Sequence, residues 1–378
     1  MTNPHRIKRI RRMMVASLVT VGTAAAMLTV NASAASAAGE VCIGGTLKYD
    51  HPDAEAGVGA PVRTALARGA DWKLFDRATT TSAAPLATGQ TDGVGAFKAC
   101  YSPTSATARD MFVRFDATSG QVSKVIARQT SPNKPYTFTT TVPRVAASRN
   151  IGTVKPPVKM AGAWKIIDTV GRLYSKRGNT ASTCWTRLQP SGGCTPLTYA
   201  WPLAGTGYAD IGDTDFVFLE RADANSMHTI LHEAGHVLQY WLHGSAFPEV
   251  VGCNDHEIKR ESSPSCAWTE GFADAVAAYA LGDARYVFSD GQSSNLIAGP
   301  DTEGWDEQDA VQGHIAGALL GLWGPAGTDA GNWNVTIEVL TQRIPADFSD
   351  YFWNARPTVG LGTGPEARQI LAANAIDY

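Results

Sequence analysis

The chain has 378 residues, of which 44% are hydrophobic and 18% charged, so it is long enough for one large domain or two ordinary ones with buried cores. Its first 39 residues hold five basic and no acidic side chains, and the remainder holds 27 basic and 35 acidic ones, a net charge of −8. The acidic remainder has no basic cluster and therefore no electrostatic attraction for nucleic acid or anionic membranes, so neither is expected as a partner.

Residues 1–38 have the layout of a secretory signal peptide. A basic start precedes an apolar run from Met13 to Val30, and the small residues Ala32-Ser33-Ala34 and Ala35-Ser36-Ala37 then suit a cleavage site. The alternative is a membrane anchor, but the run is short and rich in Ala, Thr and Gly. We therefore predict a secreted, extracellular protein that is free of the membrane once the signal is cleaved. The basic residues of the signal are Arg6, Lys8, Arg9, Arg11 and Arg12.

Residues 40–145 are predicted to form a small antiparallel β-sandwich. Short runs of alternating hydrophobicity recur there, separated by turn-prone residues such as Asp92-Gly93. The segments Pro61 to Arg63 and Thr88 to Phe97 resemble the transthyretin-like or carboxypeptidase-regulatory β-sandwich family. That resemblance implies an accessory module without chemistry of its own. The runs are Cys42 to Tyr49, Trp72 to Phe75, Phe97 to Tyr101, Met111 to Phe115, Val122 to Ala127 and Tyr136 to Val142.

A linker is predicted over residues 146–160, which contain Pro156-Pro157, and a mainly α (α+β) domain is predicted over residues 161–378. A short strand is expected from Asp215 to Glu220. The predicted fold class is therefore multi-domain, with a small all-β sandwich first and a larger, mainly helical domain second. Helices are expected at 161–174, 223–243, 267–281, 308–323, 333–343 and 365–375.

The six cysteines all follow the predicted signal peptide, and none forms a CxxC motif. An even number of cysteines in an oxidising compartment indicates disulfides rather than a cysteine metal site. Six cysteines allow fifteen pairings. We predict the pair that lies within the sandwich and the two that each close a short loop in the second domain. These pairs are Cys42–Cys100, Cys184–Cys194 and Cys253–Cys266.

The segment His232-Glu233-Ala234-Gly235-His236 lies on the helix expected at 223–243, with Asp223 as its N-cap and His243-Gly244 at its end. Residues four apart on a helix lie about 40° apart on one face, so both imidazoles can bind one metal ion. Glu233 is turned about 100° from His232 and can reach a water at the ion without being a ligand. The alternative is a pair of solvated histidines, but the apolar residues around them indicate a buried helix.

Glu270 and Asp274 are also four apart, in Trp268-Thr269-Glu270-Gly271-Phe272-Ala273-Asp274. Over residues 215–282, the order His-Glu-x-x-His and then Glu-x-x-x-Asp resembles the gluzincin peptidases, such as thermolysin-like enzymes. The resemblance implies a zincin-like catalytic domain with one zinc ion per chain, bound by His232, His236 and Glu270. It implies further that Asp274 orients a ligand histidine and that Glu233 is the general base.

Other polar residues are weaker candidates for the site. His243 lies seven residues past His236, whereas the metzincin pattern has its third histidine six past, so His243 is not expected to bind the metal. His228, one turn before His232, is expected to be a hydrogen-bonded residue outside the chemistry. His314 is the candidate donor to the oxyanion of the intermediate, with a hydrogen-bonded histidine of no catalytic role as its alternative. Tyr240 and Tyr279 are rival donors.

These patterns lead to the hypothesis of a secreted, zinc-dependent metallohydrolase, a metallopeptidase that acts on peptide or protein substrates. Two alternatives stay open. One is a catalytically inactive surface or binding protein that uses the β-sandwich, and the other is a hydrolase of non-peptide amide bonds. The substrate specificity, the role of the sandwich and the oligomeric state do not follow from the sequence.

Overall fold

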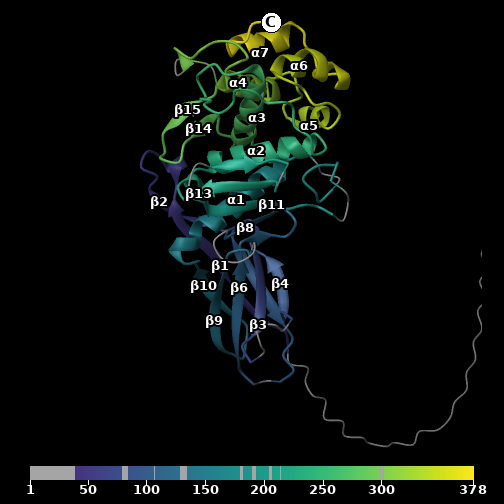
Figure 1. Cartoon of the computed structure of the whole chain (residues 1–378). Coiled ribbons are helices and arrows are strands. Elements are labelled where there is room, and N and C mark those ends of the chain that lie inside the picture. Colours follow the sequence, from purple (N-terminus) through teal and green to yellow (C-terminus); the bar gives the residue numbers. More distant parts are fainter. Residues whose placement is uncertain are drawn as a thin grey trace, which may run out of the picture. The chain divides into compact units, whose positions relative to one another are not determined.

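The computed structural model describes residues 39–378 except 79–83, 106, 128–133, 179–181, 190–192, 204–206, 213, 298 and 300–301. The predicted signal peptide, residues 1–38, lies outside the described residues. From Ala38 to Tyr378 the chain groups into one compact unit (Figure 1). Among the described helices, none combines the length and the apolar composition that crossing a membrane requires.

Strand β1 (Val41–Pro52) lies at the centre of the first sheet. Every second side chain along it is buried, as expected of a strand with one face on a core. It pairs antiparallel with β2 (Val62–Leu66) and β5 (Ala96–Tyr101), but parallel with β10 (Arg149–Val154). The antiparallel sandwich was predicted over residues 40–145, and the structure adds residues 149–154 of the expected linker to its first sheet as a parallel strand. Only Val154 of β10 is buried, so hydrophobic alternation gives no sign of it.

The second sheet packs against the first through aromatic side chains. Phe97 of β5 meets Phe115 of the second sheet edge to face, with ring centroids 5.0 Å apart. All neighbouring strands of this second sheet are antiparallel. The two sheets together contain five of the six predicted β runs. In spatial order, the strands of the second sheet are β4 (Ala87–Gln90), β3 (Asp71–Asp76), β6 (Arg109–Asp116) and β9 (Thr137–Val145).

The sixth run, Val122 to Ala127, belongs to a third sheet that crosses the predicted domain boundary (Figure 1). Its strand β8 pairs parallel with β11, which pairs parallel with β13, and β12 lies antiparallel at the edge. Alternating hydrophobicity is the same in any half-buried sheet, so the sequence pattern could not say which sheet β8 joins. In spatial order, the strands are β12 (Tyr208–Asp210), β13 (Phe216–Glu220), β11 (Leu197–Leu203), β8 (Ser123–Ile126) and β7 (Thr118–Ser119).

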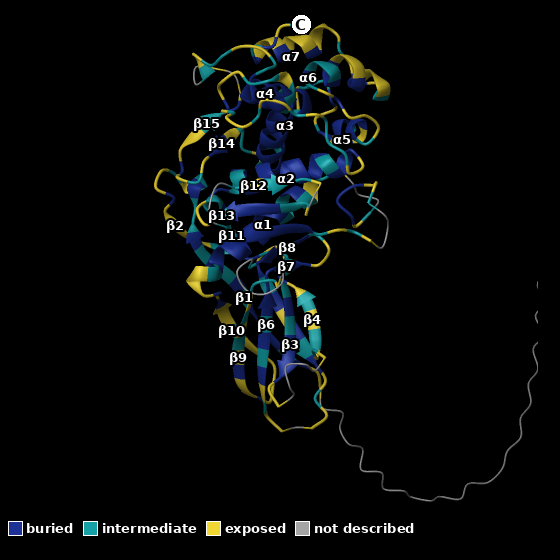
Figure 2. Cartoon of the chain, in the orientation of Figure 1, coloured by how far each residue is buried: buried dark blue, intermediate teal, exposed yellow. Residues whose placement is uncertain are grey.

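Helices α2, α3 and α4 pack side by side with α3 in the middle, and Figure 2 shows α3 and α4 almost entirely buried. Two glycines let them approach closely. A Cβ on Gly235 of α2 would lie 2.9 Å from the Cα of Ala273, and a Cβ on Gly271 of α3 would lie 2.6 Å from the carbonyl oxygen of Gln312. The helix bounds are Met227–Leu242 for α2, Pro264–Leu281 for α3 and Gln312–Trp323 for α4.

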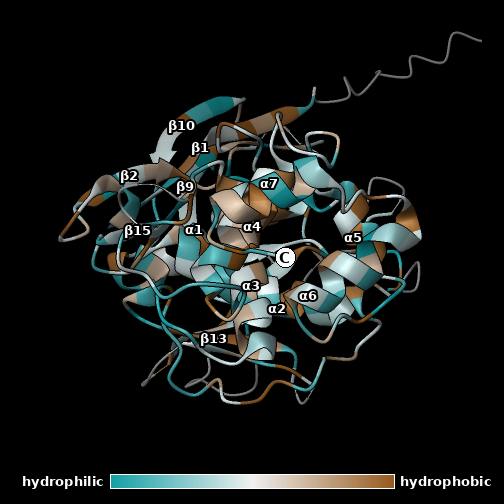
Figure 3. Cartoon of the chain, turned by 90° about the horizontal axis from the view of Figure 1, so that it is seen from above, coloured by the Kyte–Doolittle hydropathy of each residue, from teal (hydrophilic) through white to brown (hydrophobic). Residues whose placement is uncertain are grey.

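Helices α1, α5 and α7 match expected helices with shifted ends, whereas α6 was not predicted. Helix α1 (Ala161–Lys176) packs on β8 and α2, and α7 packs on α4. Helix α7 carries both hydrophilic and hydrophobic residues (Figure 3), and it buries Ala367 and Leu371. The outer face of α7 is therefore solvated, while the face that carries Ala367 and Leu371 packs on the helical core. The peripheral helices are α5 (Asn334–Leu340), α6 (Phe348–Asp350) and α7 (Pro365–Ala373).

Candidate active site

Helix α2 carries the first two candidate ligands. Ser226 is its N-cap, because the Ser226 hydroxyl accepts a hydrogen bond from the N–H of Thr229, so the predicted cap Asp223 is wrong. Asp223 instead begins a separate 3-10 turn that ends at Asn225. His232 and His236 lie one turn apart with ring centroids 4.7 Å from each other, and only 7% and 8% of their surfaces are exposed.

Helix α3 carries the carboxylates. The Ser263 hydroxyl caps its first turn, Pro264 occupies the first helical position, and Gly282 ends it in the left-handed conformation at φ 69°. Glu270 and Asp274 are both buried, so they are not solvated surface charges. The close contact of α2 and α3 at Gly235 brings this carboxylate pair to the two histidines.

The structure brings His232, His236 and Glu270 together in the geometry of a metal site. The Nε2 atoms of the histidines are 3.2 Å apart, and the Oε2 of Glu270 lies 3.1 Å from Nε2 of His232 and 3.4 Å from Nε2 of His236. A tetrahedral zinc ion with bonds of about 2.0–2.1 Å separates its ligand atoms by about 3.3–3.4 Å. The donor atoms therefore already stand at the spacing that zinc requires.

The chemistry of the three donors also fits zinc. Two imidazoles and one carboxylate are the protein ligands of one common class of catalytic zinc site, which leaves a fourth position open. The Glu270 Oε2 is buried and has no hydrogen-bond partner among the described residues. A buried carboxylate oxygen facing two ring nitrogens is costly unless a ring is protonated or a cation lies between them. Zinc bound by these three residues would remove that cost.

The two glutamates of the site have opposite pKa shifts. Burial opposes ionisation of Glu270, but the neighbouring His236 and His232 hold the pKa of its carboxyl well below the ordinary value. Burial raises the pKa of Glu233, although both histidines lower it in part. Glu270 is therefore suited to stay an anionic ligand, whereas Glu233 is the more basic carboxylate and the better proton acceptor.

A chain of hydrogen bonds orients His232 from behind. Its Nδ1 donates to Oδ1 of Asp274 at 2.7 Å, which leaves the Nε2 lone pair facing the cluster. The Asp274 Oδ2 accepts from the Gln312 amide at 3.0 Å, and the Gln312 Oε1 accepts from Nδ1 of His256 at 2.8 Å. This network places Asp274 as the sequence pattern implies and adds two residues that the pattern did not reveal.

His256 and Gln312 were missed because neither belongs to a periodic motif. The Nε2 of His256 lies 3.7 Å from Oε2 of Glu270, and His256 lines the cavity above the cluster. His256 lies in the loop between α2 and α3, and Gln312 is the first residue of α4. The only available signal was the position of a histidine between the two motifs.

A cavity of about 910 Å³ opens over the cluster. One wall is the edge strand β12, whose Tyr208 and Ala209 line the cavity. Another is the hairpin of β14 (Arg285–Val287) and β15 (Ser293–Asn295), which neither the helical nor the strand pattern predicted. The walls carry more apolar than charged side chains, which suits a substrate with apolar groups. The apolar lining residues include Ile211, Phe247, Pro248, Val250, Ile258, Tyr286 and Phe288.

The structure does not bring His314 to the cluster. Its Nε2 donates to the carbonyl oxygen of Asp306 at 2.7 Å, and its ring packs on Trp305. His314 does not line the cavity, and neither do Tyr240 and Tyr279. The prediction of His314 as oxyanion donor therefore loses its geometric basis, and the alternative of a hydrogen-bonded helix histidine describes the contacts.

His228 of α2 and His243, which follows the helix as its C-cap, also lie outside the cluster. His228 is fully buried, with Nδ1 3.4 Å from the Glu55 carboxylate and Nε2 3.3 Å from the carbonyl oxygen of Asp283. His243 is buried at the end of the helix, and burial lowers its pKa to about 4. Neither histidine lines the cavity. Both observations agree with the expectation that these residues are not ligands.

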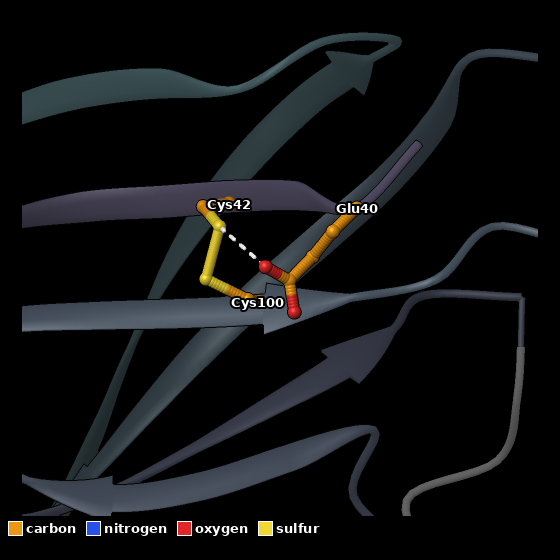
Figure 4. A group of neighbouring side chains, drawn as sticks. All are labelled: Glu40, Cys42 and Cys100. Carbon is orange, nitrogen blue, oxygen red and sulfur yellow. Dashed lines mark hydrogen bonds between the residues drawn. A yellow bond between two sulfur atoms is a disulfide. The ribbon is translucent and has the colours of Figure 1, made fainter. Parts of the chain in front are cut away.

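Two further groups of potential ligands among the described residues contain disulfide sulfurs. Figure 4 shows one of them, in which the Glu40 carboxylate points toward the sulfur of Cys42, bonded to Cys100. The other combines Cys253 with His256 and Glu270. A sulfur in a disulfide has no thiolate to offer a metal. Of the three groups, only His232, His236 and Glu270 therefore have all their donor atoms free.

Comparison with known families identifies the chain. The profile of the Mycolysin middle domain matches residues 42–163, and that of the Mycolysin C-terminal domain matches residues 177–375. The chain belongs to the mycolysin family. This is a family of secreted zinc metallopeptidases, so membership supports a zinc-dependent peptidase. The middle-domain match runs through the predicted linker and into α1, so it includes the strand β10.

Other comparisons add nothing to the family assignment. No curated protein matches the sequence. Among solved structures, the crystal structure of a 9R-lipoxygenase from Cyanothece matches with a TM-score of 0.21 and 14% sequence identity, over 56% of this chain and 27% of that one. At that TM-score the likeness carries no argument about fold or chemistry.

The cluster of His232, His236 and Glu270 lies wholly within the match to the mycolysin C-terminal domain. The structure contains the three predicted disulfides, Cys42–Cys100, Cys184–Cys194 and Cys253–Cys266. Cys266 lies in the first turn of α3, and Cys253 lines the cavity with its sulfur 3.7 Å from Oε1 of Glu270. The disulfide Cys253–Cys266 thus joins the loop between α2 and α3 to α3, the helix that carries Glu270.

Replacing both Cys253 and Cys266 with alanine is expected to weaken zinc binding by about 10-fold, the lower range for a lost outer partner of a metal site. The reason is that Glu270 loses its covalent tie to the loop beside it. Competition with a chromophoric chelator measures the affinity. The matched control replaces Cys184 and Cys194, which close a loop of similar length and do not line the cavity. An equal loss in both variants would contradict a local effect.

Proposed function

We propose that this chain is a secreted endopeptidase of the gluzincin type, with one zinc ion bound by His232, His236 and Glu270. The observation that carries the proposal is the mutual spacing of the three donor atoms, 3.1–3.4 Å, at the floor of a large cavity and next to the buried Glu233. Family membership supports the zinc and the peptidase activity. The residue roles and the mechanism are our own inference.

Zinc held by His232, His236 and Glu270 would supply a Lewis acid that could polarise the scissile carbonyl and acidify a water molecule. The carboxylate of Glu233 accepts a proton from the attacking water and delivers it to the leaving nitrogen. Asp274 keeps the Nδ1 of His232 protonated, so that Nε2 stays available for the ion. His256 replaces His314 as the imidazole placed to contact the substrate, because it lines the cavity.

The edge strand β12 offers a binding mode for an extended peptide. It pairs with β13 on one side, and no other described strand pairs with it. Because Tyr208 and Ala209 also line the cavity, a peptide added to this edge would lie over the metal centre. Main-chain hydrogen bonds of this kind accept many sequences, while the apolar walls select side chains. This geometry favours a peptide over a small non-peptide amide.

The proposal is tested by measuring the zinc content of the mature protein and its hydrolysis of casein, with and without a chelator. We expect about one zinc ion per chain, hydrolysis that stops on chelation, and recovery when zinc is returned. Zinc binding without casein hydrolysis would reject the peptidase and leave the hydrolysis of non-peptide amides. The absence of zinc from the purified protein and from protein given zinc would instead support an inactive binding protein.

A further inference from the structure

The first turn of α2 is held by a side chain from the first sheet. A helix begins with N–H groups that have no partner within the helix. The Ser226 hydroxyl accepts from the N–H of Thr229, and Oε1 of Glu55 accepts from the N–H groups of Met227 and His228, the latter at 3.2 Å. Glu55 lies in the 3-10 turn Ala54–Ala56 that connects β1 to β2. A residue of the middle domain therefore completes the cap of the metal helix.

The Glu55 carboxylate is itself held in place. Its Oε2 lies 3.7 Å from the Nζ of Lys165, a buried residue of α1 that also bonds Oδ1 of Asp53 at 3.0 Å and the carbonyl oxygen of Asn225. Burial opposes ionisation, but the bond to His228 and the charge of Lys165 lower the pKa of Glu55 to about 2. An anion at the positive end of a helix is favourable, and this anion has little freedom to move.

The same loop supports a wall of the cavity. Ala54 and Ala60 form a small buried cluster with Val287 at the end of β14. The N–H of Gly59 donates to the carbonyl oxygen of Asp290 at 2.7 Å. A Cβ on Gly291 would lie 2.0 Å from the carbonyl oxygen of Gly57, so the two backbones are in direct contact. The β14–β15 hairpin, which lines the cavity, therefore rests on the β1–β2 loop.

Side-chain contacts continue from Glu55 to a metal ligand. The Nδ1 of His228 lies 3.4 Å from Oε1 of Glu55. The His228 ring packs on Tyr286 with centroids 6.0 Å apart, and the Tyr286 ring meets His232 edge to face at 5.7 Å. A change at Glu55 thus reaches His232 both along the helix backbone and through two packed rings.

We propose that Glu55 is a positioning residue for the zinc centre, and that the β1–β2 loop makes the middle domain a structural part of the active site. The inference rests on the proposed function in that His232 and His236 are taken as zinc ligands. Glu55 is not one of the three candidate ligands and does not line the cavity. It acts by fixing the N-terminal turn of α2, the His228 ring and, with its loop, the β14–β15 hairpin.

The test compares Glu55→Ala, Glu55→Gln and the control Asp50→Asn. Asp50 lies on the same strand β1 and pairs with Lys155 at 2.7 Å, away from α2. Zinc affinity is measured by chelator competition without substrate, and hydrogen exchange follows the amides of Met227 and His228. Glu55→Ala should bind zinc about 10-fold or more weakly, as for other outer partners of metal ligands, and should exchange both amides faster. Glu55→Gln keeps an acceptor oxygen and should recover most of the affinity.

Equal zinc affinity and equal amide exchange in Glu55→Ala and the wild type would overturn the proposal. So would a loss of affinity that Asp50→Asn shares, because that would reflect general destabilisation. If the alanine variant does not fold, the glutamine variant decides, because it removes the negative charge from the start of α2. Faster exchange of the two amides and weaker zinc binding than in the wild type support the role, and wild-type values for both overturn it. Failure of the proposed function is a separate outcome, in which the wild type binds zinc but cleaves no peptide.

Discussion

Replacing Glu233 with glutamine is expected to lower kcat for peptide hydrolysis by about 10²–10⁴-fold, the usual contribution of a general base. Glutamine has the same size but its amide cannot accept the proton of the attacking water. Glu233 is buried beside the cluster, and its carboxylate is not one of the three mutually spaced donors, so zinc should stay bound. Steady-state kinetics and the metal content of the purified variant check both parts.

The matched control for this experiment is Glu257→Gln, which makes the same change in another glutamate that lines the cavity. Its kcat should stay within about twofold of the wild type, because surface carboxylates without a proton-transfer role contribute little. A Glu233→Gln variant that keeps more than about a tenth of the wild-type kcat would show that another group accepts the proton. His256 would then be the next residue to replace, since it lines the same cavity.

Replacing His236 with alanine is expected to abolish zinc binding at micromolar zinc, and activity with it. Two ligands remain, and the Oε2 of Glu270 would face a single imidazole at 3.1 Å. The loss of zinc affinity should exceed the roughly 10–100-fold loss expected for Asp274→Asn, which removes only the hydrogen-bond partner of the ligand His232. Metal content reports the loss directly. The midpoint of thermal unfolding should rise with added zinc in the wild type but not in His236→Ala, because a ligand stabilises only a native state that binds it.

His314→Ala is the control for that loss of metal, because His314 is an equally buried helix histidine whose hydrogen bond goes to a backbone carbonyl. It should keep its zinc and a near-normal kcat. Full zinc affinity in His236→Ala would show that the ion is held elsewhere. Loss of zinc in His314→Ala alone would reverse the assignment made from the structure.

The parts of the site that lie on single helices could be predicted from the sequence. His232 and His236, and likewise Glu270 and Asp274, are each separated by four residues, so helical geometry alone sets their faces. The three disulfides also followed from sequence, because each joins cysteines within one segment or one short loop. The helical pairs and the two short disulfide loops depend on local spacing, whereas Cys42–Cys100, 58 residues apart, was predicted because both cysteines lie within the expected sandwich.

Only the tertiary structure decided which distant segments meet. The place of β8 in the third sheet, the contacts of His256 and Gln312 behind the ligands, and the cap that Glu55 gives α2 all join residues far apart in the chain. None of these residues belongs to a distinguishing local pattern, because a single histidine or glutamate has the same sequence context in an ordinary loop as in a functional site. His314 shows the converse, because its helix was predicted correctly while its side chain turns to Asp306. The helical period predicts on which face of its helix a side chain lies. Which residues that side chain meets is determined by long-range packing alone.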